Sequence, residues 1–120
     1  MDIQTIKKRR DFVIGNKAPY AAMPSVVVQS YLRTDEVVKT DDSIMMGITC
    51  SKKVGNAVTR NRAKRRLREA GKIVLKGIGL KKTNYIFIAR KAVTVKVKFI
   101  DLCRDIEVGI KKIHEREVGQ

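Results

Sequence analysis

Residues 51–68 read SKKVGNAVTRNRAKRRLR, and the expected fold is built outward from this stretch. The turn-forming residues Gly55 and Asn56 precede a run dominated by cations, and Asn56 is a suitable N-cap for a helix that continues to about residue 74 or 75. From Lys52 to Lys72 the chain holds nine basic residues against the single acid Glu69. This segment therefore supplies more than half of the net charge of +15.

The periodicity of this basic helix separates an apolar stripe from rows of charge. At about 100° per residue, one narrow stripe contains Ala63, Leu67, Ala70 and Val74. The small alanines allow the helix to lie close to a sheet. Along one flank, a row of like charges repeats every four residues: Arg60, Lys64 and Arg68. Such a row weakens an isolated helix, so a binding partner is expected to compensate for the repulsion.

Strands are predicted on both sides of the basic helix. Residues Ser25 to Arg33 contain a β-branched run, and residues Ile44 to Ser51 alternate between two faces. We expect these two strands to be antiparallel neighbours, joined by a polar loop from Thr34 to Ser43. After the helix, Tyr85 to Ala89 is predicted as a third strand, which completes a strand–helix–strand unit.

The two ends of the chain are predicted to add helices. Residues Ile6 to Asn16 suit a short basic helix, and Lys17 to Pro24 is expected to be irregular or edge structure because it contains both prolines. A final amphipathic helix is indicated by apolar residues at helical spacing, namely Phe99, Cys103, Ile106, Ile110 and Ile113. The predicted fold class is α/β (α+β): a two-layer sandwich with a small mixed sheet and helices on one face.

The composition points to one domain and a polyanionic partner. A chain of 120 residues is expected to form a single domain over 1–120, with its core at about 6–114. A pI near 10.2 makes nucleic acid the expected partner. No apolar run suits a membrane span or a signal peptide, which predicts a cytoplasmic protein without a membrane partner. Cys50 and Cys103 lie in apolar patterns and are expected to be reduced core residues.

The start of the basic helix has the chemistry of a phosphate site. Backbone N–H groups and the positive end of the helix dipole meet there, beside the guanidinium groups of Arg60 and Arg62. An uncovered sheet face is expected to offer a groove for single-stranded nucleic acid, where exposed side chains meet bases or sugars: Phe12, Gln29, Tyr31 and Thr49. For Phe12 and Tyr31, a place in the core is an equal alternative.

A search for protein catalysis finds no constellation of catalytic residues. His114 is the only histidine and is expected to be solvated at a helix end, and Asp41 with Asp42 is expected to be a solubilising pair. No metal-ligand cluster, Gly-rich phosphate loop or nucleophile elbow occurs. We therefore predict no catalytic residue and no metal ligand in this chain, so another component must perform any reaction in which the chain takes part.

The sequence resembles the protein subunit of bacterial ribonuclease P from about Ile6 to Lys112. The motif SKKVGNAVTRNRAKRRLRE at Ser51 to Glu69 carries most of the similarity, supported by KKRRDF at Lys7 to Phe12 and NYIFIARKA at Asn84 to Ala92. The resemblance implies a left-handed strand–helix–strand crossover, against the usual right-handed preference. It also implies that the partners are a catalytic RNA and precursor transfer RNA, with Mg²⁺ held mainly by the RNA.

The resemblance further implies two RNA-contacting regions. Contacts with the catalytic RNA are expected from Lys52, Lys53, Arg60, Asn61, Arg62, Lys64, Arg65 and Arg68. A groove between the first helix and the sheet is expected to bind the 5′ leader through Phe12, Gln29 and Thr49. Asn16 and Gln29 stand where family members often carry aromatic residues, so the groove is expected to stack less and to hydrogen-bond more.

The resulting hypothesis is a non-catalytic, RNA-binding protein subunit of ribonuclease P, a ribonucleoprotein endonuclease and hydrolase of transfer RNA processing, with no small-molecule substrate. The alternative is a ribosomal or general RNA-binding protein without a role in transfer RNA processing. A self-sufficient nuclease is disfavoured because no His or carboxylate constellation exists. A DNA-binding helix–turn–helix fits poorly because no helix precedes the basic one at turn distance.

Overall fold

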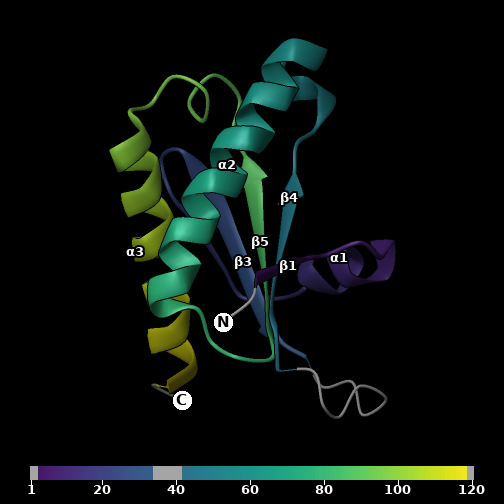
Figure 1. Ribbon diagram of the computed structural model, residues 1–120, viewed down its shortest axis with the longest axis vertical. Helices are drawn as coiled ribbons and strands as arrows, with labels where there is room; N and C mark the ends of the chain where they lie inside the picture. The colour runs from purple at the N-terminus through teal and green to yellow at the C-terminus, as the bar shows by residue number, and fades with distance from the viewer. Residues whose placement is uncertain (1–2, 34–41, 119–120) are drawn as a thin grey trace.

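The sheet is organised around the strand–helix–strand unit that contains the basic helix. The computed structural model describes residues 3–33 and 42–118, with side chains as far as residue 116. In it, β4 (Ile44–Thr49) leads through a 3-10 turn, η2 (Lys52–Val54), into α2 (Ala57–Ile78), and α2 leads into β5 (Thr83–Ala89). Figure 1 shows α2 in front of the sheet, with β4 and the parallel β5 running upward and β5 to the left of β4. The crossover is therefore left-handed, as the resemblance implied.

Three further strands complete a five-stranded mixed sheet in the order β1-β4-β5-β3-β2. β3 (Val26–Leu32) is antiparallel to β5, and β2 (Tyr20–Ala22) is antiparallel to β3 at one edge. β1 (Ile3–Thr5) is parallel to β4 at the other edge. No strand is predicted from the sequence at β1, whereas irregular or edge structure is predicted in the region of β2.

One predicted pairing is wrong. The strands predicted at Ser25 to Arg33 and Ile44 to Ser51 are not neighbours, because β5 lies between β3 and β4 and pairs with both. The crossover through α2 returns the chain to this central position. With β5 on one edge of β4 and β1 on the other, no edge of β4 is left for β3. Of the predicted loop between the two strands, residues 34–41 lie outside the described part of the chain.

The main core lies between the sheet and the two long helices. The predicted stripe of α2 is buried, with Ala63, Leu67 and Ala70 fully so. α3 (Phe99–Val118) adds buried isoleucines at the predicted spacing, at positions 106, 110 and 113. The aromatic side chains of Tyr85 and Phe87 on central β5 are buried as well. Burial on both helices confirms the apolar faces predicted from periodicity.

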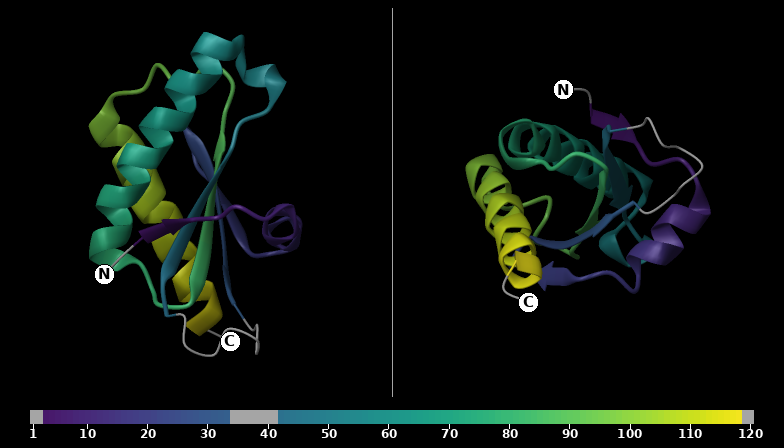
Figure 2. Two further views of the ribbon diagram at one scale, coloured as in Figure 1. Left: turned by 45° about the vertical axis from the view of Figure 1, so that its right-hand side comes forward. Right: turned by 90° about the horizontal axis from the view of Figure 1, so that it is seen from below.

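The two faces of the sheet carry different helices (Figure 2). A Cβ added at Gly71 of α2 would meet Phe87, whereas a Cβ at Gly15 of the short helix α1 (Arg9–Gly15) would meet Ile86. Adjacent strand residues point to opposite faces, so α1 lies on the face opposite α2 and α3. The prediction of helices on one face therefore describes the two long helices, while α1 covers part of the other face.

The helix boundaries differ from the predicted ones by a few residues. α1 begins at Arg9 because the chain before it is extended, with the Ile6 N–H donating to the Met46 carbonyl at 2.9 Å. α1 ends at Gly15 with Asn16 as its C-cap. α2 continues to Ile78, beyond the predicted end at residue 74 or 75, and the Gly79 N–H donates to the Leu75 carbonyl at 2.9 Å.

Candidate nucleic-acid interface

Two residues set the start of α2. The Asn56 side-chain oxygen accepts a hydrogen bond from the Thr59 backbone N–H at 2.9 Å. Gly55 has a φ of 154°, and a Cβ at this position would lie 2.9 Å from the Thr59 side chain. Glycine is therefore required by both the backbone conformation and the available space. No acidic residue occupies the first turn, so the positive end of the helix dipole is not neutralised there.

The short turn η2 presents two lysines next to the start of α2. Val54 is 7% exposed and anchors the turn in the core. The Val54 N–H donates to the Ser51 carbonyl at 3.1 Å, which closes the turn. Lys52 and Lys53, which precede this anchor, are exposed. The buried Val54 thus fixes the backbone of the turn, and the two lysines before it face the solvent.

The polar residues of α2 are distributed around the helix outside the buried stripe. Arg60 and Lys64 are half-buried. Arg60 also carries an Nε that is shielded from solvent and has no hydrogen-bond partner within the described residues. The remaining predicted contacts with RNA on this helix are exposed, namely Asn61, Arg62, Arg65 and Arg68.

The charge of this region is not neutralised by the protein itself. Within the part of the chain that the structure describes, the ion pairs involve Arg10, Lys82, Arg104 and Lys111, and none involves a cation between Lys52 and Lys72. A buried apolar stripe on one side and unpaired cations on the others make α2 a suitable surface for a polyanion.

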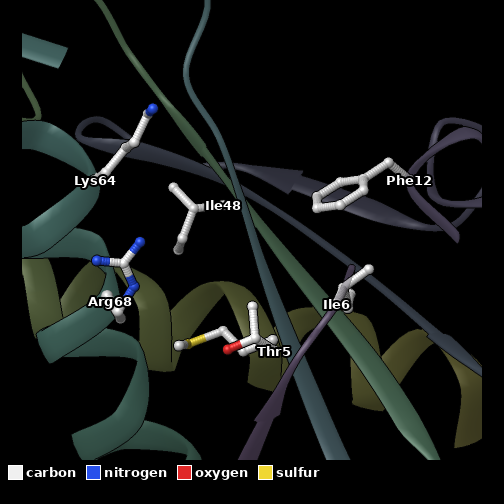
Figure 3. Close-up of a pocket in the computed structure, with 7 residues that line it drawn as sticks. Thr5, Ile6, Phe12, Ile48, Lys64 and Arg68 are labelled. Carbon is white, nitrogen blue, oxygen red and sulfur yellow. The ribbon is translucent and has the colours of Figure 1, made fainter. Parts of the chain in front are cut away.

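A hollow of about 220 Å³ lies where α2 passes the edge of the sheet (Figure 3). Lys64 and Arg68 of α2 lie on one side of it, Phe12 of α1 lies on the other, and Ile48 of β4 lies between them. The remaining lining residues are Thr5, Ile6 and Met46. The hollow thus brings two cations of the basic helix close to the aromatic residue predicted for the leader groove.

The position of Phe12 depends on a glycine in β4. A Cβ added at Gly47 would lie 2.7 Å from Phe12 Cε1 and 3.1 Å from Ile6 Cδ1. Phe12 is half-buried, so its ring is packed against the sheet and also accessible from the hollow. The core alternative therefore describes the side of the ring that packs on Gly47, and binding by the accessible side stays a prediction.

Two other residues that were expected to be exposed in the groove, Gln29 and Tyr31, are buried or half-buried instead. Gln29 is only 8% exposed and lies under the end of α1, where a Cβ at Gly15 would be 3.5 Å from its Oε1. The expectation of an exposed Gln29 is wrong because α1 covers it. Tyr31 is half-buried; its hydroxyl donates to the Asp11 carbonyl at 2.7 Å and accepts from Asn84 Nδ2 at 2.8 Å. Burial is the main cause that raises the pKa of Tyr31 above its ordinary value.

Beyond α1, one cross-strand row of the same sheet face is more accessible. Thr49 is aligned with Ile88, Ile88 with Val27, and Val27 with Ala22. Thr49 and Ala22 are exposed, and the two residues between them are half-buried. Thr49 thus lies at the β4 end of a shallow apolar row beside α1. Val27 and Ile88 are not among the groove residues predicted above, although strand alternation places them on the same face as Thr49.

The cations of α2 also act on a nearby thiol. Both cysteines are free and half-buried. Burial raises the pKa of Cys50, while the charges of Lys64 and Arg60 partly offset this rise. Burial likewise raises the pKa of Cys103, and Arg66 partly offsets it. Cys50 thus lies within the field of the basic flank.

The only histidine packs against a buried tyrosine. His114 is half-buried, and its Nε2 lies 3.1 Å from the hydroxyl of the buried Tyr85. The expectation of a solvated His114 is wrong because the ring of Tyr85 packs against it edge-on, with the ring centroids 6.1 Å apart. Asp41 lies outside the described residues.

Metal sites and membrane spans can be checked across residues 3–33 and 42–118. In these residues, no three His, Cys, Asp or Glu side chains form a group that could hold a metal ion. None of the helices in this part of the chain has the length and apolar character of a membrane span.

Comparison with known proteins gives the family. A family model described as Ribonuclease P matches residues 3–114 of this chain. The chain belongs to the ribonuclease P protein family. It is therefore the non-catalytic protein component of a ribonucleoprotein endoribonuclease, and its partner is RNA. The resemblance carried by residues 51–69 is confirmed.

Similar proteins cover nearly the whole chain. The ribonuclease P protein component of Ruegeria pomeroyi is 40% identical over 112 residues, which cover 93% of this chain and 87% of that protein. That of Caulobacter vibrioides is 36% identical over 129 aligned positions, covering 99% and 84%. The structure of the Staphylococcus aureus RNase P protein is similar with a TM-score of 0.70 and 31% identity, covering 90% and 93%. The RNase P protein from Thermotoga maritima, at 23% identity, shares the fold with a TM-score of 0.69.

Proposed function

We propose that this chain binds the catalytic RNA of ribonuclease P through the start and flank of α2, and the 5′ leader of precursor transfer RNA along the sheet face beside α1. In this role it assists the Mg²⁺-dependent endonucleolytic removal of the leader, which produces mature 5′ ends. The observation that carries the proposal is the hollow in which Lys64 and Arg68, both without ion-pair partners among the described residues, face Phe12.

The contribution of α2 is electrostatic. Exposed guanidinium groups can each hold two phosphate oxygens, while Lys52 and Lys53 act as point charges beside the helix start. If six phosphates are neutralised, the affinity should fall with salt with a log–log slope of roughly −4 to −5. The contacts proposed for the catalytic RNA are Lys52, Lys53, Arg60, Asn61, Arg62, Lys64, Arg65 and Arg68.

The contribution of the α1 face is positioning. Phe12 offers an aromatic ring to an unstacked base, and Thr49 offers a hydroxyl at the end of the accessible row. Gln29 supports α1 from below and is not proposed as a contact, because it is buried. A leader held here and a catalytic RNA held on α2 are brought together across the edge of the sheet, which favours one orientation of the substrate.

Magnesium belongs to the RNA in this proposal. Glu69 is the only acidic side chain between Lys52 and Lys72, so the proposed interface does not offer the oxygen ligands that Mg²⁺ requires. The protein acts by neutralising phosphates, which lowers the concentration of magnesium needed to bring two polyanions together. We further propose that residues 1–120 form a single RNA-binding domain with its core at about 6–114, and that the chain works in the cytoplasm.

The test is cleavage of the 5′ leader from a precursor transfer RNA by its cognate catalytic RNA at low magnesium, with and without the protein. The protein should restore cleavage that the RNA alone does not perform at that magnesium concentration. Changing Arg60, Arg62 and Arg65 to Ala should remove most of this stimulation, and raised magnesium should recover it.

A matched control removes positive charge from a surface outside the proposed interface. Lys111 and Lys112 are exposed lysines near the far end of α3, and K111Q/K112Q removes two charges outside the proposed interface. This variant should stimulate cleavage almost as well as the unchanged chain. RNA binding without any stimulation of leader cleavage would contradict the proposal and favour a general RNA-binding role.

A further inference from the structure

Arg66 of the basic helix points away from the hollow and is bound to the protein. Arg66 lies about 200° around the helix from Lys64 and from Arg68, on the flank that faces α3. Its Nε donates to the Thr94 carbonyl at 3.1 Å, and its Nη2 donates to the Val97 carbonyl. Both acceptors belong to the segment 90–98, which joins β5 to α3. Arg66 therefore connects this segment to α2.

The segment 90–98 is also held by hydrogen bonds to the turn between β2 and β3. Thr94 is fully buried; its hydroxyl accepts from the Arg90 N–H at 2.8 Å and donates to the Ser25 carbonyl at 2.6 Å. Arg90 Nη1 donates to the Met23 carbonyl at 2.9 Å. Ser25 is held in turn by Asp105 of α3, whose carboxylate accepts from the Ser25 N–H and hydroxyl. These bonds anchor the segment to the β2–β3 turn, and Arg66 anchors it to the basic helix.

The anchored segment presents only positive charge. Lys96 and Lys98 are exposed and lie on either side of Val97, whose carbonyl Arg66 holds. Lys91 is exposed as well, and no acidic residue occurs between Arg90 and Lys98. Arg62, one helical turn before Arg66, is also exposed. Figure 1 shows the segment at the end of the molecule where α2 begins, near the proposed RNA contacts.

We propose that Lys96 and Lys98 form a second phosphate-binding strip on the α3 side of α2, and that Arg66 is a positioning residue that holds this strip in place. The ligand is the phosphodiester backbone of the same RNA that binds α2, so the inference rests on the proposed function. Two of the five N–H groups of Arg66 donate to backbone carbonyls, so the role proposed for Arg66 is to hold the strip, and the exposed lysines contact the phosphates. The RNA-binding surface is thus wider than the signature residues of α2.

The test is a double-mutant cycle of RNA affinity, measured with the full chain and the cognate catalytic RNA at several salt concentrations. K96Q/K98Q should weaken binding about tenfold at moderate salt and reduce the log–log salt slope by about 1.4 to 1.8, as expected for two lost phosphate contacts. R66Q should weaken binding by a similar factor. When R66Q is added to K96Q/K98Q, it should cause little further loss.

R66K separates positioning from direct contact. Lysine keeps the charge but cannot reach both carbonyls with a planar fork, so R66K should be as defective as R66Q. Hydrogen exchange of residues 90–98 should be faster in both variants than in the unchanged chain. Normal affinity in R66K, or additive losses in the cycle, would show that Arg66 binds RNA directly and would overturn the proposal.

Two further variants separate this inference from the proposed function. K64Q/R68Q removes charge from the flank at the hollow, and K111Q/K112Q is the remote control with the same loss of charge. If K64Q/R68Q weakens binding while K96Q/K98Q resembles the remote control, the second strip is wrong and the proposed function stands. If none of these variants alters binding, both the strip and the proposed RNA surface are wrong.

Discussion

Gly47 leaves the space that the ring of Phe12 occupies. A Cβ at this position would lie 2.7 to 2.8 Å from two ring atoms, which is closer than packed carbon atoms approach. Phe12 reaches the edge of the sheet because a strand residue without a side chain lies beneath it. The accessible part of Phe12 therefore depends on a residue that has no side chain to contact RNA.

Gly47→Ala is expected to lower the free energy of unfolding by about 1 to 3 kcal/mol, because the ring of Phe12 must be displaced. The measurement is urea denaturation followed by far-ultraviolet circular dichroism. In a Phe12→Leu background the same substitution should cost less, since the clashing ring is absent. Equal costs in both backgrounds would show that the strain lies elsewhere.

Cys50 reports the electrostatic field of the basic flank. Burial raises the pKa of Cys50, and Lys64 is the first of two charges that lower it. In a Cys103→Ser chain, the pH profile of iodoacetamide alkylation should therefore have its midpoint above the ordinary thiol value. Lys64→Gln removes a lowering charge, so the midpoint should move further up and alkylation at pH 8 should become slower.

The remote substitution Lys111→Gln is the control for this titration. It lies on α3 and should leave the midpoint of Cys50 unchanged. A midpoint that falls, or that stays constant, in the Lys64→Gln chain would contradict the assignment of Lys64 to the surroundings of Cys50.

At the scale of elements, the sequence of α2 keeps the face that packs on the sheet apart from the cations proposed to bind RNA. The buried stripe packs on the sheet, and the cations occupy the remaining circumference. Like charges along a helix oppose its formation, so capping and packing must stabilise α2 when RNA is absent. The side chain of Asn56 supplies the cap, with Thr59 as the donor.

Asn56→Ala should lower the free energy of unfolding by about 0.5 to 2 kcal/mol, because the Thr59 N–H loses its acceptor. Asn56→Asp keeps an acceptor and adds a negative charge at the positive end of the helix dipole, so stability should be retained. The same Asp variant should bind RNA more weakly, since its charge repels phosphate. Thermal unfolding and RNA binding, measured on both variants, check this separation; weaker folding in both would contradict the capping role.

For the whole molecule, a net charge of +15 opposes compactness. An anion that binds the folded chain preferentially should stabilise it according to its concentration and affinity. The clustered cations of α2 provide such a site only when the chain is folded, because the crossover aligns them along one helix beside η2. Stability should therefore depend on multivalent anions more than on ionic strength.

Pyrophosphate at low millimolar concentration is expected to raise the unfolding temperature, whereas sodium chloride at the same ionic strength should raise it less. Circular dichroism melts over a series of pyrophosphate concentrations provide the measurement. In the variant with Arg60, Arg62 and Arg65 changed to Ala, the rise should be reduced. An equal rise for both salts would show that general screening, rather than a site, is responsible.

The sequence by itself determined the features that depend on near neighbours along the chain. The Asn56 cap, the buried stripe from Ala63 to Val74 and the alternation in Tyr85 to Ala89 follow from helical and strand periodicity. The positive charge of residues 52–72 can be counted without knowledge of the fold. The motif at residues 51–69 identified the correct family. These signals are local, so a single sequence carries them.

Only the tertiary structure decided which distant segments meet. It inserted β5 between β3 and β4, added β1 at the edge and covered Gln29 with α1. It also turned Arg66 toward residues 94 and 97 while Lys64 and Arg68 faced Phe12. Such contacts depend on strand order and on the packing of whole elements against one another. Periodicity assigns a residue to a face, but the partner across that face is set by long-range packing.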